Sequence, residues 1–249
     1  MSDFSEIREI FKERNACVLI PTYNNAQVLP VLLQDILQYT DRIIVVNDGS
    51  TDETAYMLER TEIETVSFPK NRGKGWALRQ GFKKAVELGY TYAITIDSDG
   101  QHFADDLEVF LKAIDEHPNS IIIGARNMEQ SSVPGKSSFG NKFSNFWFWV
   151  ETGIKLPDTQ SGYRAYPVKA LSGFNFITRK YEFEIEVIVR AAWKGIGVRC
   201  VPVKVFYPEK ANRISHFRPF RDFLRISVLN TMLVAVAFLY IKPRDFFRR

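Results

Sequence analysis

Two carboxylates stand one residue apart at the end of a strongly apolar segment. The segment YAITI, residues 92–96, is followed by DSDGQH, in which Asp97 and Asp99 flank a serine. In an exposed loop, an Asp-x-Asp pair serves as a turn and helix cap, and this alternative applies here too. However, the preceding apolar run is typical of a buried strand, whose end would hold both carboxylates at the mouth of a sheet.

Two hard oxygen donors this close to each other suit a divalent cation. Mg²⁺ and Mn²⁺ bind such oxygens and keep open positions for substrate phosphates. The substrate that fits best is a nucleotide diphosphate, because a metal that bridges its phosphates neutralises the charge that develops on the leaving group. The pair therefore predicts metal-assisted transfer chemistry at Asp97 and Asp99.

Apolar and amphipathic segments alternate along most of the chain. The predicted strands are residues 16–20, 42–46, 64–68, 92–96, 120–124 and 198–206. The predicted helices are residues 4–11, 28–37, 76–88 and 106–116, with a further helix begun by Ser50 and Glu53, which have the spacing of a capping box. Short, nearly all-apolar strands that alternate with helices indicate an α/β domain with a mostly parallel sheet covered on both faces.

Three polar clusters follow three of these strands. They are residues 21–25, 47–52 and 97–102. In parallel sheets, ligands bind outside the carboxyl ends of the strands, so we expect the three clusters to converge on one site.

The second half of the chain is less regular. Residues 127–142 are polar, contain Pro and Gly, and are predicted to form a mobile loop. The aromatic cluster FSNFWFWV, residues 143–150, suits either a core or a membrane contact. Glu182, Glu184 and Glu186 lie on a helix or a strand.

Six motifs carry a resemblance to a known family. In order, they are VLIPTYNN, IIVVNDGSTDET, NRGKGWALRQGF, ITIDSDGQH, IIIGARN and DTQSGYRAY, over nearly all of residues 16–206. Together they resemble a family 2 glycosyltransferase of the GT-A (Rossmann-like) fold, above all the branch of dolichyl-phosphate mannosyltransferase and the polyprenyl-phosphate glycosyltransferases. The resemblance implies a metal-dependent inverting enzyme that takes a sugar from a nucleotide-diphosphate donor.

The resemblance also implies roles for individual residues. The implied donor-binding residues are Pro21, Tyr23, Asn25, Asp48, Lys74, Asp97 and Arg126, and the implied ligands of Mg²⁺ or Mn²⁺ are Asp97, Asp99 and Gln101. The implied catalytic residues are Asp99, Gln160, Arg164 and Glu184, and those for an acceptor phosphate are Ser161, Arg213 and Ser215.

Three of these assignments have open alternatives. Asn25 departs from the branch, which commonly has Glu there, and the departure leaves the donor base open. Lys74 stands in a Gly-rich loop before a helix, where it either contacts phosphate or belongs to a surface turn. Glu184 lies either near the site or on a solvated face.

The residue types near the reacting groups bear on the acceptor. A hydroxyl acceptor usually needs a carboxylate base, for which Asp158 and Glu184 are the candidates, whereas a phosphate is already an anion. QSGYR contains an amide and an arginine, which suit an anionic acceptor such as undecaprenyl or dolichyl phosphate. The alternatives are transfer to a hydroxyl of a glycan, glycolipid or small molecule, and a catalytically silent nucleotide-sugar sensor.

The chain divides by composition into a glycosyltransferase domain, residues 1–211, and a basic and apolar tail, residues 212–249. If the tail is helical, Arg218, Arg221 and Arg225 share one face. Residues 226–241 are mostly apolar but short for a membrane span, so the tail packs on the protein, lies in a membrane interface or crosses the bilayer.

The flanks of the tail and the start of the chain indicate a location. Basic and aromatic residues flank the apolar part of the tail and favour an anionic cytoplasmic leaflet, and their alternation with apolar residues argues against a nucleic-acid partner. The first residues are charged and resemble no secretory signal, and two isolated cysteines fit a reducing compartment. We therefore expect a cytoplasmic protein, peripheral or monotopic at the cytoplasmic face of a membrane.

Overall fold

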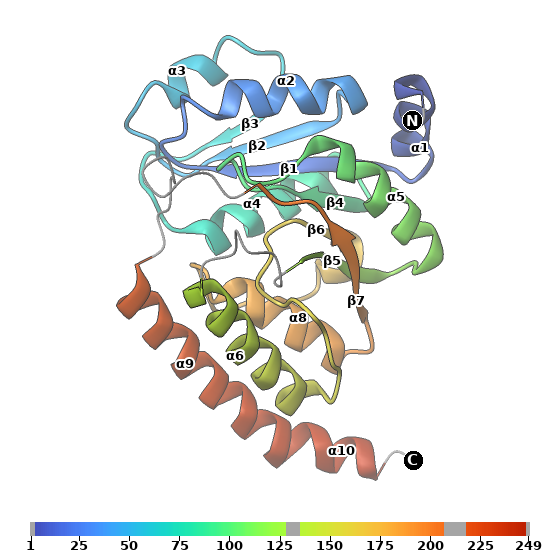
Figure 1. Ribbon diagram of the computed structural model, residues 1–249, viewed down its shortest axis with the longest axis vertical. Coiled ribbons are helices and arrows are strands. Elements are labelled where there is room, and N and C mark those ends of the chain that lie inside the picture. Colours follow the sequence, from blue (N-terminus) through green and yellow to red (C-terminus); the bar gives the residue numbers. More distant parts are fainter. Residues whose placement is uncertain (1–2, 128–134, 207–217, 248–249) are drawn as a thin grey trace.

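The computed structural model describes residues 3–127, 135–206 and 218–247, and a seven-stranded sheet forms its centre (Figure 1). The strands are β1 (Ala16–Thr22), β2 (Ile43–Asn47), β3 (Glu64–Ser67), β4 (Tyr92–Thr95), β5 (Ser120–Arg126), β6 (Arg164–Pro167) and β7 (Gly197–Val203). Their order is β3-β2-β1-β4-β6-β5-β7, and only β6 runs antiparallel to its neighbours, β4 and β5. The predicted α/β class with a mostly parallel sheet is confirmed.

Helices cover both faces of the sheet (Figure 1). They are α1 (Phe4–Glu13), α2 (Leu29–Tyr39), α3 (Thr54–Leu58), α4 (Lys74–Glu87), η1 (Ala104–Asp106), α5 (Leu107–Glu116), α6 (Gly135–Thr152), α7 (Val168–Leu171), α8 (Phe183–Trp193), α9 (Pro219–Val236), η3 (Ala237–Ile241) and α10 (Lys242–Phe246). Buried side chains of α1, α2 and α5 form the core on one face, and those of α4, α7, α8 and α9 form the core on the other.

Strand β1 shows how the sequence builds both cores. Cys17 and Leu19 point into the core on the α4 side, whereas Val18 and Ile20 point into the core on the α1 and α2 side. This alternation requires apolar residues at every position, and the whole strand is buried. Helix α4 packs closely here, because a Cβ atom at Gly81 would lie 2.3 Å from a methyl carbon of Leu19.

Two local predictions are wrong. The predicted loop of residues 127–142 is helical from Gly135, where α6 begins; residues 128–134 lie outside the described part of the chain. The capping box of Ser50 and Glu53 does not form, because α3 starts at Thr54 and Asp52 Oδ1 accepts the Thr54 N–H at 3.0 Å. The Ser50 hydroxyl oxygen instead accepts the Asn24 N–H at 2.9 Å, which joins two loops at the edge of the sheet.

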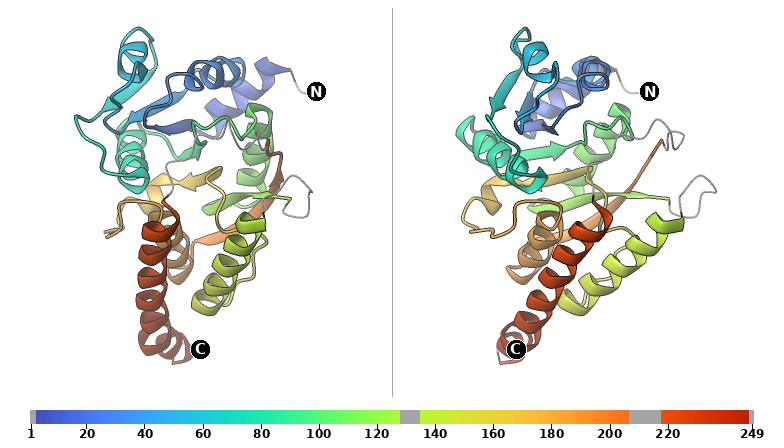
Figure 2. Two further views of the ribbon diagram at one scale, coloured as in Figure 1. Left: turned by 60° about the vertical axis from the view of Figure 1, so that its left-hand side comes forward. Right: turned by 90° about the vertical axis from the view of Figure 1, so that its left-hand side faces the viewer.

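The tail forms one long helix through α9, η3 and α10, which projects with α6 to one side of the sheet (Figure 2). One side of this helix packs on the domain through residues spaced three or four apart, namely Ile226, Leu229, Leu233, Ala237 and Ile241. The opposite side exposes large apolar residues, which include Phe220, Leu224, Val228, Met232, Val236 and Leu239. The helical segment Phe220–Phe246 is longer than the predicted apolar stretch of residues 226–241, and it is long and apolar enough to cross a membrane by length and composition alone, so the three predicted positions of the tail stay predictions.

The arginines of the tail do not form the predicted single face. Arg221 and Arg225 lie in α9, but Arg218 precedes the helix as its N-cap and has an extended backbone. Arg225 pairs with Asp222 at 3.3 Å. The predicted boundary between residues 211 and 212 lies outside the described residues and stays a prediction.

Candidate active site

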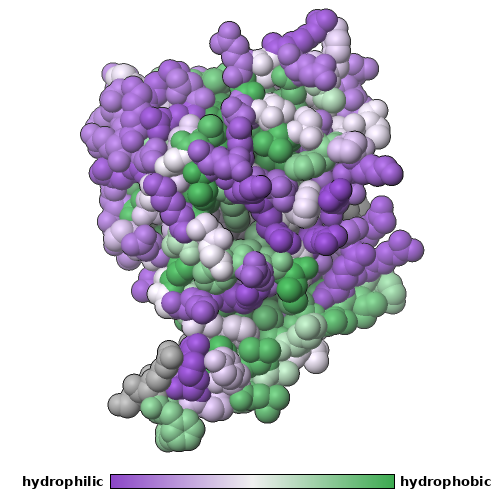
Figure 3. Space-filling model, turned by 180° about the vertical axis from the view of Figure 1, so that it is seen from behind, coloured by the Kyte–Doolittle hydropathy of each residue, from purple (hydrophilic) through white to green (hydrophobic). Residues whose placement is uncertain are grey.

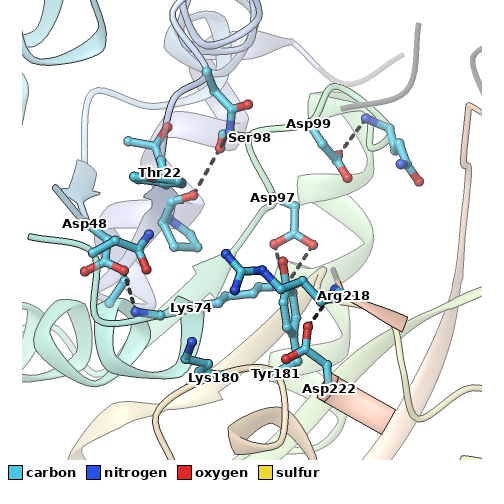
Figure 4. Close-up of a pocket in the computed structure, with 17 residues that line it drawn as sticks. Thr22, Asp48, Lys74, Asp97, Ser98, Asp99, Lys180, Tyr181, Arg218 and Asp222 are labelled. Atoms are coloured by element: carbon cyan, nitrogen blue, oxygen red, sulfur yellow. Dashed lines mark hydrogen bonds and ion pairs between the residues drawn. The ribbon is translucent and has the colours of Figure 1, made fainter. Parts of the chain in front are cut away.

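The three polar clusters converge, as predicted, around one cavity at the carboxyl edge of the sheet (Figure 4). The cavity has a volume of about 570 Å³. Its lining includes the predicted donor and metal residues Pro21, Tyr23, Asn25, Asp48, Lys74, Asp97, Asp99 and Gln101. Sequence motifs from four separate loops therefore meet at one site.

The register of the strands brings these loops together. Thr22 at the end of β1 is paired with Asn47 at the end of β2, so Asp48 follows directly beside it. After β4, the Ser98 hydroxyl donates to the Pro21 carbonyl oxygen at 3.1 Å, and the Asn25 amide donates to the Ser98 oxygen at 2.7 Å. Ser98 thus locks the Asp-x-Asp loop onto the loop after β1.

Asp48 forms one wall of the cavity together with the loop that precedes α4. Its carboxylate accepts the N–H groups of Arg72 and Gly73, at 2.9 Å and 2.6 Å. Burial raises the pKa of Asp48, although these two hydrogen bonds act in the opposite direction. Gly73 has a φ of +107°, which favours glycine, so the loop can turn its amide toward the carboxylate.

Two polar atoms on the same wall lack a protein partner among the described residues. They are Thr22 Oγ1 and Asn25 Oδ1, and both belong to residues that line the cavity. Because a buried polar atom without a hydrogen bond is costly, these atoms are suited to bind polar groups of a ligand.

Lys74 joins Asp97 to Glu184 at the floor of the cavity. Its ammonium lies 2.7 Å from Asp97 Oδ1 and 3.0 Å from Glu184 Oε2. Burial alone would lower the pKa of Lys74, but the charges of Asp97 and Glu184 outweigh it and raise that pKa. The alternatives of a surface turn for Lys74 and a solvated face for Glu184 are therefore wrong.

The QSGYR loop packs directly behind this ion cluster. The Thr95 hydroxyl donates to the Gly162 carbonyl oxygen at 2.8 Å, which fixes the loop to the end of β4. A Cβ atom at Gly162 would lie 2.3 Å from Asp97 Oδ2 and 2.6 Å from Lys74 Nζ. Only glycine leaves room here for the Lys74–Asp97 pair.

The donor set of the Asp-x-Asp loop fits a hard divalent cation. Burial and the nearby charge of Asp97 raise the pKa of Asp99 to about 6, so a cation would relieve the repulsion between the two carboxylates. The Gln101 N–H donates to Asp99 Oδ1 at 3.0 Å and fixes this loop. The described residues contain no cluster of three His, Cys, Asp or Glu side chains, and substrate phosphates would complete the coordination of Mg²⁺ or Mn²⁺.

Other predicted residues lie outside the lining of the cavity. The Arg126 guanidinium forms two hydrogen bonds with Asp158, at 2.7 Å and 3.1 Å, and the Arg126 N–H donates to Asp158 Oδ2 at 3.2 Å. Gln160 is exposed. Ser161 is buried, and its N–H donates to Asp158 Oδ1 at 3.2 Å. Arg213 and Ser215 lie outside the described residues. The roles of these residues stay predictions.

Arg164 is fully buried, and its guanidinium donates to backbone carbonyl oxygens. The acceptors are Ser161 at 2.5 Å, Thr159 at 2.9 Å and Glu184 at 2.7 Å. This arrangement joins the QSGYR loop to the start of α8. It supports a positioning role for Arg164 behind the ion cluster, and a direct catalytic contact stays a prediction.

Sequence reasoning missed part of the cavity lining. The missed residues are Thr22, Asn71, Gly73, Ala77, Ser98, Lys180, Tyr181, Arg218 and Asp222. The motifs that predicted the site contain Thr22, Asn71, Gly73 and Ser98. Their position beside predicted site residues was therefore a sequence signal that could have identified them. Lys180 and Tyr181 directly precede the Glu182 to Glu186 region, and no sequence signal brings Arg218 and Asp222 to this place.

The comparisons with known proteins agree with this geometry. Residues 17–174 match the family model described as Glycosyl transferase family 2. UDP-N-acetylglucosamine--dolichyl-phosphate N-acetylglucosaminyltransferase of Methanococcus voltae is 28% identical over 215 residues, which cover 77% of this chain and 86% of the relative. Polyprenol monophosphomannose synthase of Mycolicibacterium smegmatis is 28% identical over 200 residues, which cover 75% of each chain.

A solved glycosyltransferase structure has a fold similar to that of this chain. Glucosyl-3-phosphoglycerate synthase from Mycobacterium tuberculosis, in complex with Mn²⁺, UDP-glucose and phosphoglyceric acid, matches with a TM-score of 0.69 and 18% identity. The match covers 94% of this chain and 83% of that one. With the family match over the motifs that line the cavity, the chain belongs to glycosyltransferase family 2 and has a GT-A-like fold.

Proposed function

We propose that this glycosyltransferase transfers a sugar from a nucleotide-diphosphate donor to a polyprenyl phosphate, undecaprenyl or dolichyl, with inversion at the anomeric carbon. The observation that carries the proposal is the position of the tail. Arg218 and Asp222, at the start of the tail helix, line the same cavity as the predicted donor residues. The remainder of that helix exposes an apolar side, so the cavity adjoins a surface suited to lipid.

The acids near the cavity support an anionic acceptor. Asp158 is fully buried, and its carboxylate accepts hydrogen bonds from the Arg126 guanidinium, from Asn141 and from three backbone N–H groups. Against the effect of burial, these bonds and the Arg126 charge lower the pKa of Asp158, so it is poorly suited to remove a proton. Glu184 is held by Lys74. A phosphate oxygen needs no such base and would attack the anomeric carbon as the nucleotide diphosphate leaves.

Mg²⁺ or Mn²⁺ is part of the proposal. Asp97, Asp99 and Gln101 would hold the ion, which would neutralise charge on the diphosphate leaving group when bound. Lys74 and Lys180 also line the cavity, and their positive charges suit the negative charge of a diphosphate. The similarity to a structure that contains Mn²⁺ and UDP-glucose supports this cofactor class.

The proposed location is the cytoplasmic face of a membrane, with the protein peripheral or monotopic. Figure 3 shows an apolar band along the part of the surface formed by the tail helix, whereas much of the remaining surface in that view is hydrophilic. On α6, Phe146 and Trp149 are exposed while Phe148 is buried, so the aromatic cluster contributes to both the core and the surface. The relatives named for dolichyl-phosphate and polyprenol substrates support a lipid acceptor.

A second candidate is transfer to a hydroxyl of a glycan, glycolipid or small molecule. The similarity to the solved glucosyl-3-phosphoglycerate synthase, whose complex contains phosphoglyceric acid, supports this candidate.

A transfer assay tests the proposal. Radiolabelled UDP- and GDP-sugars are each incubated with the protein, Mg²⁺ or Mn²⁺ and polyprenyl phosphate in detergent. We expect label in an organic extract that disappears with EDTA; donor consumption that needs a glycan or glycolipid instead would favour the second candidate.

A further inference from the structure

The start of the tail helix is built into the wall of the cavity. Arg218 and Asp222 line it together with Lys74, Lys180 and Asp97. In Figure 4, the Arg218 side chain extends from the start of α9 into the cavity. Arg218 stands 37 positions after Tyr181, the lining residue that precedes it in the sequence.

Asp222 fixes the backbone at Arg218. The Arg218 N–H donates to Asp222 Oδ2 at 2.7 Å, and Asp222 Oδ1 accepts from Arg225 at 3.3 Å. Asp222 is only 2% exposed, so this N-cap contact is shielded from water. The first turn of α9 therefore holds Arg218 at the cavity.

The guanidinium of Arg218 remains available to a ligand. Within the described residues, its backbone N–H is engaged by Asp222, but no hydrogen bond or ion pair engages its side chain. A guanidinium binds phosphate oxygens with two parallel N–H donors, and the positively charged residues Lys74 and Lys180 line the same cavity. A group with several negative oxygens is the ligand that this arrangement fits.

We propose that Arg218 binds a phosphate group in the active site, and that the tail helix is thereby a part of the catalytic centre as well as a surface for lipid. This inference rests on the proposed function, because it assumes that phosphates enter this cavity. The phosphate belongs either to the donor diphosphate or to the acceptor lipid, and the chemistry of recognition is the same. Helix α9, which follows Arg218, packs on α6, where the ring centroids of Phe143 and Phe223 lie 5.3 Å apart, and this packing fixes its position.

The test compares Arg218→Ala and Arg218→Lys with Arg221→Ala, a control in the same turn that does not line the cavity. Titration calorimetry with UDP and GDP in Mn²⁺ measures nucleotide binding, and steady-state transfer measures KM for the lipid phosphate. We expect Arg218→Ala either to weaken nucleotide binding or to raise the KM for the lipid phosphate, by about ten- to a hundredfold. Arg218→Lys should recover part of this loss, and Arg221→Ala should change neither quantity.

The two measurements separate the sources of the phosphate. Weaker nucleotide binding assigns Arg218 to the donor diphosphate, and a raised KM for lipid phosphate with normal nucleotide binding assigns it to the acceptor. Equal behaviour of Arg218→Ala and Arg221→Ala in both measurements would overturn the inference. The proposed function is judged separately on the wild-type chain, since transfer to a hydroxyl acceptor would contradict it while the nucleotide titration still reports on Arg218.

Discussion

Lys74 is the residue at which the two sides of the candidate active site meet. Its ammonium bridges Asp97, from the Asp-x-Asp loop, and Glu184, from the start of α8. Removal of one partner from such a buried group leaves a charge unpaired, which costs more than the pair itself contributes. The cluster is therefore sensitive to small changes in the residues that surround it.

Asp99→Asn tests the proposed metal site at a single atom. The change removes one charged ligand but keeps the shape of the side chain, so we expect a loss of transfer of at least about a hundredfold. Because it also relieves the repulsion with Asp97 that raises the pKa of Asp99, the melting temperature at about pH 7 should not fall. Transfer assays and thermal unfolding measure the two effects. Asp35→Asn, at an exposed position of α2, is the control and should leave both unchanged. Wild-type rates in Asp99→Asn would refute the metal assignment.

Gly162→Ala tests the close packing behind the ion cluster. The added methyl group would lie within 2.6 Å of both Asp97 Oδ2 and Lys74 Nζ, so the pair must shift. We expect about a hundredfold loss of turnover and a destabilisation of about 1–3 kcal/mol, measured by transfer assays and by denaturant unfolding. Gly173→Ala, where nothing lies within 4 Å, is the matched control. Equal activity in the two variants would contradict this account of the cluster.

The cavity residues that can be predicted from the sequence are those that directly follow a predicted strand. Asp48, Asp97 and Asp99 are found in this way, because the carboxyl ends of parallel strands meet at one edge of the sheet. Arg218 and Asp222 follow no strand, and their position depends on how the tail helix folds back over α6 and α8. Such a tertiary contact leaves no local pattern in the sequence.

At the scale of elements, α6 shows why some predictions fail. Its first residues contain Gly135 and several serines, which are typical of loops, and yet they are helical because the following turns pack on α8 and α9. Strand β6 is also not predicted, since its four residues begin with the buried Arg164. In both elements, tertiary contacts outweigh the local preferences of the sequence.

The same helix carries a buried carboxylate whose ionisation should affect stability. Burial raises the pKa of Glu151 to about 8, and neither of its carboxylate oxygens has a partner among the described residues. The unfolded chain releases this proton at about pH 4.3, so the folded state binds the proton more tightly and its stability falls as the pH rises from about 4.3 to about 8. Glu151→Gln should remove this loss and raise the melting temperature more at about pH 9 than at about pH 6.

Glu186→Gln is the matched comparison for this prediction. Glu186 is equally buried, but its carboxylate accepts hydrogen bonds from Ile177, Thr178 and Arg190. Its replacement removes the ion pair with Arg190, which is partly exposed and keeps its hydrogen bond to the Asn175 carbonyl oxygen, and should lower the melting temperature by an amount that corresponds to about 1–3 kcal/mol. If Glu151→Gln also lowers the melting temperature at about pH 9, Glu151 has a stabilising partner and the explanation is wrong.

At the scale of the whole molecule, the tail helix has two apolar sides. One packs on the domain and the other is exposed, as Leu239, at 82% exposure, and Val228, at 54%, illustrate. A helix that packs one side on the domain and exposes an apolar side agrees with the proposed interfacial location. The composition of the tail predicts an apolar helix, but only the packing on the domain reveals which side stays exposed.

Val228→Asp and Leu239→Asp test the exposed side. Each change removes an apolar contact and adds a charge that anionic lipid repels, so we expect flotation with vesicles of phosphatidylcholine and phosphatidylglycerol to fall about tenfold or more. Val31→Asp introduces the same charge at an exposed valine of α2 and should bind as the wild type does. Equal vesicle binding by all three variants would mean that the tail does not contact the membrane.

The linkage in the product tests the central claim, a lipid phosphate acceptor, most directly. The labelled product of wild-type protein, donor sugar, Mg²⁺ or Mn²⁺ and polyprenyl phosphate is extracted into organic solvent and treated with mild acid. We expect mild acid to release the sugar, because a lipid phosphate acceptor yields a sugar phosphodiester, and we expect Asp99→Asn to form no such product. Label that survives mild acid, as an ordinary glycoside does, would instead identify a hydroxyl as the acceptor and refute the proposed function.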